Sequence, residues 1–312
     1  MYDPALPLVS VVTPSFNQGR FLRATIESVL GQSYPNLEYI VIDGGSSDGS
    51  LGILQSYAHE PRLRWLSEPD RGQSDAINKG WARSCGQILA WLNSDDTYLP
   101  AAISTQVQAL LADPSAGAVY ADAQYIDAAG RSLTRIYGRP YSPQALLRLE
   151  LPAQPTVFLR RELVAQVGPI SLARRYSMDT DYWARLARLA PFRQVRALVA
   201  TYRLHPESKT VGQTSGFYQE WLEVAEHFFA HPDLPGELRA ARGEVIADIY
   251  AAIANLEAQT GSLPQLLRYL AYALAAGGLR PRMLKLPLVL AERYLPLGLA
   301  ARASDLWGRV RR

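Results

Sequence analysis

The sequence predicts an α/β fold in which a sheet built from βαβ units is followed by a helical C-terminal region. Two observations lead to this prediction. Over roughly the first 125 residues, short β-branched runs alternate with segments whose apolar residues recur at helical spacing. From about Ser215 onward the pattern is helical and is punctuated by prolines. We therefore expect one domain over residues 1–215 and a helical region over residues 216–312.

Strands are expected where short apolar runs, largely β-branched, are bounded by glycine, proline or acidic residues. In chain order these runs are residues 8–12, 39–42, 63–66, 88–92 and 118–120. Shorter strand-like pieces at 156–159 and 195–202 lie in a less regular middle section.

Helices are expected where apolar residues recur three or four positions apart. In chain order the segments are 21–30, 74–84, 100–111 and 181–189. Gly31 suits the end of the first helix, and Pro100 suits the first turn of the third.

Composition and charge are those of a globular protein. The chain has 312 residues, 48% apolar and 20% charged, and its net charge of +3 is too small to predict a nucleic-acid partner. The single cysteine, Cys85, excludes an intramolecular disulfide and is interpreted as a small packed residue. No secretory signal opens the chain, and no stretch reaches the ~18 uninterrupted apolar residues of a membrane-spanning helix. We expect a cytoplasmic protein that could attach only peripherally, at the inner face of the membrane.

Acidic residues follow two of the predicted strands directly. Asp43 ends the second strand, and Asp95 and Asp96 follow the fourth. Ligands bind at the carboxyl ends of strands in an open α/β sheet, and adjacent acids on a tight loop suit Mg²⁺ or Mn²⁺ bound to a substrate diphosphate. The alternative for Asp95 and Asp96 is capping of the helix that begins near Pro100. Because Asp43 lies at the same edge, we favour a ligand site.

The glycine-rich loop from Gly44 to Gly49 differs from the known phosphate-binding loops. Its G-x-x-x-x-G spacing is followed by Ser50-Leu51, where a phosphate-binding loop needs lysine and then serine or threonine. The adjacent Gly44 and Gly45 also do not fit the dinucleotide pattern G-x-G-x-x-G. The loop therefore predicts neither an ATPase nor a dinucleotide-binding protein.

Three segments together resemble family 2 glycosyltransferases: residues 10–18 (SVVTPSFNQ), 41–50 (VIDGGSSDGS) and 92–96 (LNSDD). They occur in the family's order, and the resemblance covers roughly the first two-thirds of the chain. It implies the GT-A fold, a Rossmann-like mixed sheet flanked by helices, here with a C-terminal helical extension. It also implies an inverting enzyme that transfers a sugar from a nucleotide-diphosphate sugar, most often a UDP-sugar, to a glycan or lipid-linked acceptor.

The resemblance also assigns donor contacts. The loop after the first strand would touch the nucleotide, Asp43 would bind its base or ribose, and residues 71–80 would close over the donor. In that last segment Asp75 and Asn78 lie one helical turn apart and can share a face. The implied donor-binding residues are Thr13, Pro14, Ser15, Asn17, Asp43, Arg71, Gly72, Asp75, Asn78 and Ser94.

The family's D-x-D metal motif falls on Asn93-Ser94-Asp95, whose first position is an amide here. Asparagine contributes no negative charge, so Asp95 is the expected main ligand, with Asp96 beside it. His205 matches a late segment of related enzymes that lies near the metal, although a structural role is equally open. Lys209 in that segment could meet phosphate oxygens. The resemblance thus implies Mn²⁺ or Mg²⁺ at Asp95, Asp96 and His205.

Residues 178–183 resemble the family's acid-rich segment, although methionine replaces the usual glutamate at its start. Asp179 matches the general base, the carboxylate that takes the proton of the acceptor hydroxyl. The alternative is that Asp179 caps the helix at 181–189. On the acceptor side the resemblance implies Gln154, Asp181 and Trp183.

Other functions remain open at this point. Asn93 and Met178 allow a non-catalytic sugar-nucleotide-binding or scaffold protein of the same fold. A nucleotidyltransferase is disfavoured, because its first loop would be rich in glycine whereas residues 13–20 contain only Gly19. The C-terminal helices carry apolar stripes with interspersed arginines. For these helices we favour packing, within the chain or in a homodimer, over contact with anionic lipid.

Overall fold

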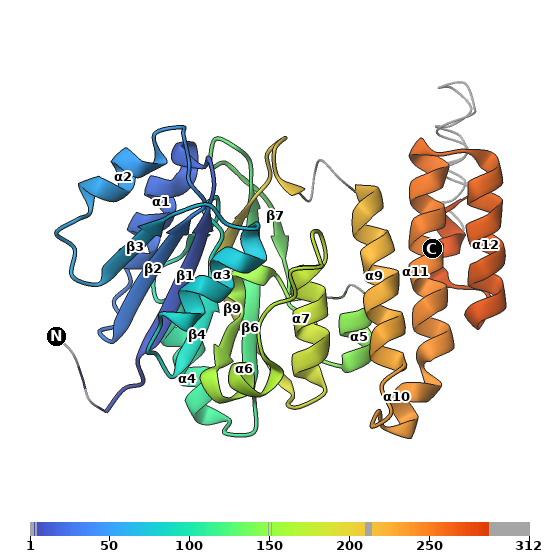
Figure 1. Cartoon of the computed structure of the whole chain (residues 1–312). Helices are drawn as coiled ribbons and strands as arrows, with labels where there is room; N and C mark the ends of the chain where they lie inside the picture. Colours follow the sequence, from blue (N-terminus) through green and yellow to red (C-terminus); the bar gives the residue numbers. More distant parts are fainter. Residues whose placement is uncertain (1–2, 4, 149, 151, 210–213, 287–312) are drawn as a thin grey trace. The chain divides into compact units, whose positions relative to one another are not determined.

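The computed structural model describes residues 3, 5–148, 150, 152–209 and 214–286. The chain forms two compact units, Met1–Gly212 and Gln213–Arg312, which are described separately (Figure 1). The first unit is a mixed sheet flanked by helices, and the second is helical, as the sequence predicts.

The sheet has the strand order β3-β2-β1-β4-β8-β6-β9-β5, with β7 paired to β6. The strands are β1 (Val9–Ser15), β2 (Leu37–Asp43), β3 (Leu63–Ser67), β4 (Ile88–Trp91), β5 (Thr97–Tyr98), β6 (Ala118–Ile126), β7 (Ser132–Ile136), β8 (Phe158–Arg160) and β9 (Phe192–Arg203). β1 to β4 are mutually parallel, and β8 is antiparallel to both β4 and β6. β5–β9 and β6–β7 are antiparallel as well, whereas β6 and β9 are parallel, so the sheet is mixed.

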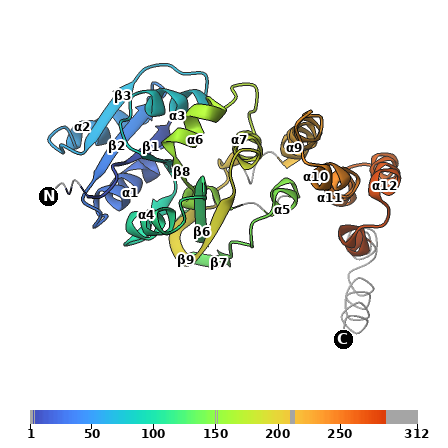
Figure 2. The same cartoon turned by 90° about the horizontal axis from the view of Figure 1, so that it is seen from below.

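Helices cover both faces of the sheet (Figure 2). They are α1 (Gly19–Leu30), α2 (Ser50–Ser56), α3 (Gln73–Ala82), α4 (Ala102–Ala112), α5 (Pro143–Leu147), α6 (Arg161–Val167) and α7 (Met178–Ala187), with a 3₁₀ turn at Gln154–Thr156. On one face, Leu22 and Ile26 of α1 and Ile103 of α4 are fully buried in one apolar cluster with the sheet. On the other face α3 lies so close to β1 that a Cβ at Gly80 would overlap the side chain of Val12.

Two predicted helix starts differ from the structure. α4 begins at Ala102, so Pro100 precedes the helix rather than standing in its first turn, and Asp95 and Asp96 do not cap it. α7 begins at Met178 rather than near Asp181, which places Asp179 inside the first turn. Both capping alternatives from the sequence are therefore wrong.

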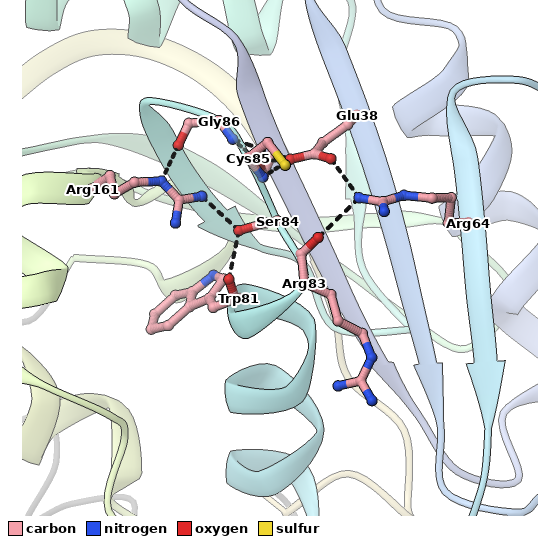
Figure 3. A network of polar contacts seen from close by, with 9 residues as sticks. Glu38, Arg64, Trp81, Arg83, Ser84, Cys85, Gly86 and Arg161 are labelled. Carbon is pink, nitrogen blue, oxygen red and sulfur yellow. Dashed lines mark hydrogen bonds and ion pairs between the residues drawn. The ribbon is translucent and has the colours of Figure 1, made fainter.

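A polar cluster at the amino ends of the parallel strands ties the α3–β4 connection to the sheet (Figure 3). The Glu38 carboxylate accepts hydrogen bonds from the Ser10 hydroxyl (2.5 Å) and from the backbone N–H groups of Gly86 (3.1 Å) and Cys85. It also pairs with Arg64 at 2.6 Å. Cys85 is exposed, so its interpretation as a packed residue is wrong; its backbone, not its thiol, makes the structural contact.

The second unit consists of α9 (Thr214–Phe229), α10 (Gly236–Ala240), α11 (Arg242–Thr260), α12 (Leu263–Gly277) and a 3₁₀ turn at Pro281–Lys285. α11 and α12 approach closely, because a Cβ at Gly243 would lie 2.6 Å from the carbonyl oxygen of Ala276. Arg280 closes the pair with two hydrogen bonds of 2.9 and 3.0 Å to Asp248. Among the described residues, no helix is long and apolar enough to span a bilayer.

Candidate active site

The parallel strands end side by side and bring their following loops together. In register, Ser15 at the end of β1 lies opposite Asp43 of β2, and Asp43 lies opposite Ser67 of β3. β4 ends beside β1 at Trp91. Because the carboxyl ends of parallel strands share one edge, the loops that carry the predicted site residues share it too.

The Asp43 carboxylate is fully buried and is held by its own loop. Its oxygens accept hydrogen bonds from the Ser67 hydroxyl (2.7 Å), the Ser46 hydroxyl (2.5 Å) and the Ser46 backbone N–H (2.9 Å), and also from the N–H of Gly45 (3.1 Å). Gly45 has a φ of +85°, which glycine adopts without strain. Asp43 therefore shapes the glycine-rich loop, and its contact with a nucleotide stays a prediction.

Asn17 joins the first loop to the glycine-rich loop. Its backbone N–H donates to the Ser46 hydroxyl at 2.8 Å, and its side-chain oxygen accepts from the Ser47 N–H at 2.9 Å. Thr13 points into the core, where it accepts a hydrogen bond of 2.9 Å from the Tyr39 hydroxyl. The buried Ser15 hydroxyl has no hydrogen-bond partner among the described residues, so it is available to a ligand. Pro14 is buried between them.

The segment before α3 is braced by charge. Arg71 pairs with Asp75 at 2.9 Å, and this hydrogen bond lowers the pKa of the Asp75 carboxyl. Gly72 has a φ of +104°, so the chain enters the helix through a conformation that disfavours other residues. The side-chain amide of Asn78 donates to the carbonyl oxygen of Ile170 at 2.8 Å and accepts the backbone N–H of Ile170 at 2.9 Å. Such a residue is structural in this geometry, and its predicted donor contact remains untested.

Asp95 and His205 meet at this edge. The Nε2 atom of His205 lies 3.0 Å from a carboxylate oxygen of Asp95. The imidazole is almost fully buried and packs 4.9 Å from the ring of Phe21, while Asp95 keeps part of its side chain exposed. Arg203 fixes the loop by donating to the Asp95 carbonyl oxygen at 2.8 Å.

Asp96 differs from its neighbour. One of its carboxylate oxygens accepts the backbone N–H of Arg203 at 2.8 Å, and the other is buried with no hydrogen bond of 3.5 Å or less within the described part of the chain, although the Asn93 amide is near enough to lower the pKa of this carboxyl. Burial, and then repulsion from Asp95, raise the pKa of the Asp96 carboxyl well above its usual value. The Thr25 hydroxyl pins the turn by donating to the carbonyl oxygens of Ser94 (2.9 Å) and Asp96 (2.8 Å).

Asp95 and His205 together offer a carboxylate oxygen and an imidazole nitrogen, which are both ligands that a divalent cation accepts. Within the described ranges, no three histidine, cysteine or acidic side chains form a ready metal cage. Mn²⁺ and Mg²⁺ often bind through one or two protein ligands and complete their shell with substrate phosphates and water. Asp95 and His205 fit that pattern together, whereas Asp96 in this geometry is turned to the backbone of Arg203.

Asp179 stands in the first turn of α7. Its carboxylate accepts the backbone N–H of Thr180 at 2.7 Å. Burial raises the pKa of the Asp179 carboxyl, and the hydrogen bonds from Thr180, followed by the positive charge of Lys209, partly oppose that rise. The helix start reaches α3, because the Ser74 hydroxyl contacts the sulfur of Met178 at 3.1 Å. A carboxyl group with a raised pKa at a ligand-binding edge is suited to accept a proton.

A row of side-chain hydrogen bonds connects these segments. Lys209 contacts Gln73 (2.9 Å), Gln73 contacts Asn93 (2.7 Å), and Asn93 contacts Gln154 (3.0 Å). Gln154 in turn donates to the carbonyl oxygen of Trp91 at 2.9 Å. Gln73 was not named among the predicted site residues, although it lies in the segment 71–80 that was expected to close over the donor.

The other two residues predicted on the acceptor side, Trp183 and Asp181, contact other residues of the protein in this structure. Trp183 is fully buried and stacks on Trp91 with ring centroids 4.8 Å apart. Contact between Trp183 and an acceptor would require the core to open. Asp181 forms a helical ion pair with Arg185 at 3.0 Å.

The structure is a mixed sheet flanked by helices, and the ends of its parallel strands carry Asp43 and the Asp95–His205 pair. Residues 10–164, about half of the chain, match the model of glycosyl transferase family 2. The chain belongs to this family.

Curated relatives match a similar portion of the chain. A chondroitin synthase of Escherichia coli is 28% identical over 208 residues, which is 66% of this chain and 30% of that protein. The O-antigen biosynthesis protein RfbC of Myxococcus xanthus is 32% identical over 185 residues, 58% of this chain and 14% of the relative. An uncharacterized glycosyltransferase of Rickettsia felis is 27% identical over 64% of this chain and 35% of its own length. The chain thus spans about a third or less of the length of these relatives.

Solved structures share the fold over most of the chain. S. aureus TarS 1–349 in complex with UDP-GlcNAc aligns with a TM-score of 0.69 at 15% identity, covering 92% of this chain and 87% of that one. The mannosyltransferase PcManGT from Pyrobaculum calidifontis, in complex with GDP-Man and Mn²⁺, aligns with a TM-score of 0.59 at 19% identity, covering 93% and 87%. At these identities the likeness establishes the GT-A fold alone.

Proposed function

We propose that this chain is an inverting glycosyltransferase that moves a sugar from a nucleoside diphosphate sugar, a UDP-sugar in the first instance, to an acceptor hydroxyl. The observation that carries the proposal is the contact of Asp95 with His205 at the strand edge. The start of α7, which carries Asp179, contacts the start of α3 through Met178 and Ser74. Relatives named for chondroitin and O-antigen synthesis support an acceptor that is a glycan or a lipid-linked precursor, in polysaccharide, cell-envelope or glycolipid synthesis.

The donor would lie along the strand ends. Its nucleotide faces the loops of Ser15 and Asn17, where the unpartnered Ser15 hydroxyl offers a hydrogen bond. Its diphosphate faces Asp95 and His205, which would hold Mn²⁺ or Mg²⁺. When bound, such a cation neutralises the charge that develops on the leaving diphosphate.

Asp179 supplies the remaining chemistry. The acceptor oxygen attacks the anomeric carbon as the bond from that carbon to the diphosphate oxygen breaks, and the proton of the acceptor hydroxyl passes to the Asp179 carboxylate. Burial raises the pKa of Asp179 and so makes it a stronger base than an exposed aspartate. Attack from the face opposite the leaving group inverts the anomeric configuration and needs no covalent enzyme intermediate.

The test is a panel of nucleotide sugars scored by release of nucleoside diphosphate, with and without Mn²⁺. Wild-type chain should release nucleoside diphosphate from at least one donor, and Asp179→Asn should not. Donor binding that depends on Mn²⁺, without turnover by either protein, would instead favour the non-catalytic scaffold that Asn93 and Met178 leave open.

For the C-terminal helices, the exposed face of α12 supports contact with an anionic membrane surface. Leu263, Leu267 and Leu274 are each about half exposed. Leu267 lies about one turn after Leu263, and Leu274 lies about two turns after Leu267, so all three share one side of the helix. From residue 263 to residue 286 the sequence has no acidic residue, and besides Arg280, which is paired with Asp248, it has three basic residues: Arg268, Arg282 and Lys285. We therefore propose lipid rather than a second copy as the partner of this face, against our preference from sequence.

Co-sedimentation of the full chain with vesicles tests this proposal. Anionic vesicles should retain the chain, zwitterionic vesicles should not, and Leu267→Ser with Leu274→Ser should reduce retention. Leu111→Ser, a similarly exposed position on α4, is the matched control. Absence of retention, together with a dimer that the same double change dissociates, would show that the face binds a second copy.

A further inference from the structure

The row of side-chain hydrogen bonds beside the candidate active site has a fixed direction. Lys209 can only donate, and the carbonyl oxygen of Trp91 can only accept, so both ends of the row are determined. Between them Gln73 donates to Asn93, and Asn93 donates to Gln154. Each of the three amides therefore accepts on one side and donates on the other.

Only an amide satisfies position 93 in this arrangement. If Gln154 turned its amide over, its oxygen would face the Trp91 carbonyl oxygen, and two acceptors would meet. With Gln154 so held, its oxygen faces Asn93, which must supply an N–H group. An ionised aspartate at 93 could accept from Gln73 but would set a carboxylate oxygen against the Gln154 oxygen.

The row of hydrogen bonds ends at the ammonium group of Lys209, whose charge acts on the candidate general base Asp179. Lys209 is held by Gln73 at 2.9 Å and by the carbonyl oxygen of Arg175 at 3.3 Å, four residues before Asp179. The Asp179 carboxyl accepts hydrogen bonds from the backbone N–H and the hydroxyl of Thr180. These hydrogen bonds, the backbone N–H of Asp179 itself and the ammonium of Lys209 favour the ionised form of this carboxyl.

We propose that Asn93 is a positioning residue rather than a metal ligand, and that its amide, through Gln73, holds the Lys209 ammonium beside Asp179. The amide at the first position of the metal motif is then required by the hydrogen-bond row and is not a weakened ligand. The catalytic meaning of this proposal rests on the proposed function, whereas the placement of Lys209 does not.

The first experiment compares Asn93→Asp with wild type in donor turnover at increasing Mn²⁺. A positioning role predicts that kcat falls about 5-fold or more while the Mn²⁺ concentration for half-maximal activity does not fall. A ligand role predicts the opposite, a lower Mn²⁺ requirement with activity kept or raised, and this result would overturn the proposal. Asn255→Asp, which adds the same charge on α11, is the control.

The second experiment reads Asp179 without any turnover. The pKa of its carboxyl is followed by the ¹³C resonance of the side chain, assigned by its loss in Asp179→Asn. Lys209→Met should raise the pKa of Asp179 by up to about one unit. Asn93→Leu, which removes the amide without adding charge, should raise the pKa of Asp179 similarly. The double variant Asn93→Leu with Lys209→Met should raise this pKa no further than Lys209→Met alone.

Gln73→Met interrupts the same row of hydrogen bonds at a second position, and it replaces Asn93→Leu if that variant does not fold. The proposal is overturned if Lys209→Met raises the pKa of Asp179 but both Asn93→Leu and Gln73→Met leave it unchanged, because Lys209 would then be held without the row. Because this titration needs no substrate, its result separates failure of the positioning proposal from failure of the proposed enzymatic activity.

Discussion

The Nε2 atom of His205 lies 3.0 Å from a carboxylate oxygen of Asp95, although 110 positions separate the two residues in the chain. β9 brings them together: it pairs with β5, directly after Asp95 and Asp96, and it ends at Arg203. The backbone N–H of Arg203 then binds Asp96, and its side chain binds the Asp95 carbonyl oxygen. The acid–imidazole pair is therefore fixed by sheet pairing rather than by local sequence.

Replacing either member of this pair should impair metal-supported turnover. Asp95→Asn keeps the shape of the side chain but removes its charge, so we expect kcat to fall about 100-fold or more and the Mn²⁺ requirement to rise. His205→Asn should raise the Mn²⁺ requirement about 10-fold or more. Titration of Mn²⁺ against nucleoside diphosphate release measures both effects. Unchanged Mn²⁺ dependence in both variants would remove the pair from the metal site.

Asp179→Asn should abolish proton acceptance with little effect on donor binding. General bases contribute about 10² to 10⁴ in rate, so kcat should fall by that factor while the donor KM stays nearly constant. In wild type, activity should be lost as pH falls through the pKa of Asp179, which burial places above the ordinary aspartate value of about 3.9. A pH–rate profile checks this, and an acid limb below pH 4 would speak against it.

Asp96→Asn should stabilise the fold increasingly as pH rises. The pKa of Asp96 is raised in the folded state, so the native protein binds this proton more tightly than the unfolded chain. Its stabilising contribution is complete below the unfolded pKa of about 3.9 and is lost as pH rises through the folded pKa. Asparagine keeps the acceptor for Arg203 without this dependence. Metal-free thermal melting from pH 4 to pH 8 measures the difference, and a pH-independent gap would refute the argument.

Gly86→Ala should destabilise the fold at the edge opposite the site. A Cβ there would overlap the Ser10 hydroxyl and lie 2.7 Å from the Ser10 nitrogen and 2.8 Å from the Leu8 carbonyl oxygen. We expect the free energy of unfolding to fall by about 1 to 3 kcal/mol. Gly52→Ala is the matched control, because nothing lies within 4 Å of its Cβ and α2 should gain up to about 1 kcal/mol. Chemical denaturation measures the free energy of unfolding of both variants and of wild type. A Gly86→Ala variant as stable as wild type would contradict the close packing at Gly86.

The spacing of apolar residues and the residues that follow each predicted strand predicted much of the fold. The five strand runs, the first helices and the place of Asp43, Asp95 and Asp96 at one edge follow from local patterns, because burial periodicity and turn residues are local properties. The antiparallel position of β8 between β4 and β6 could not be read in this way. It depends on which strands pair over distances of up to about 70 residues, and single-strand patterns do not encode partners.

The individual side chains of the site were less accessible from sequence. The sequence predicted both Asp95 and Asp96 at the metal, with Asp95 as the main ligand, but the structure separates them: Asp95 faces His205, and Asp96 is buried against Arg203. Gln73 lies in the segment 71–80 matched to the family, but its contacts with Asn93 and Lys209 could not be predicted from that match. Such differences depend on the directions of side chains at converging loops, which residue spacing does not determine.

The most direct test of the central claim is release of nucleoside diphosphate from a panel of nucleotide sugars by purified wild-type chain with Mn²⁺, run beside Asp179→Asn and Asp95→Asn. The account predicts turnover of at least one donor by wild type and loss of that turnover in both variants, which should remain folded. Equal release by all three proteins, or none by wild type while Mn²⁺-dependent donor binding persists, would contradict it.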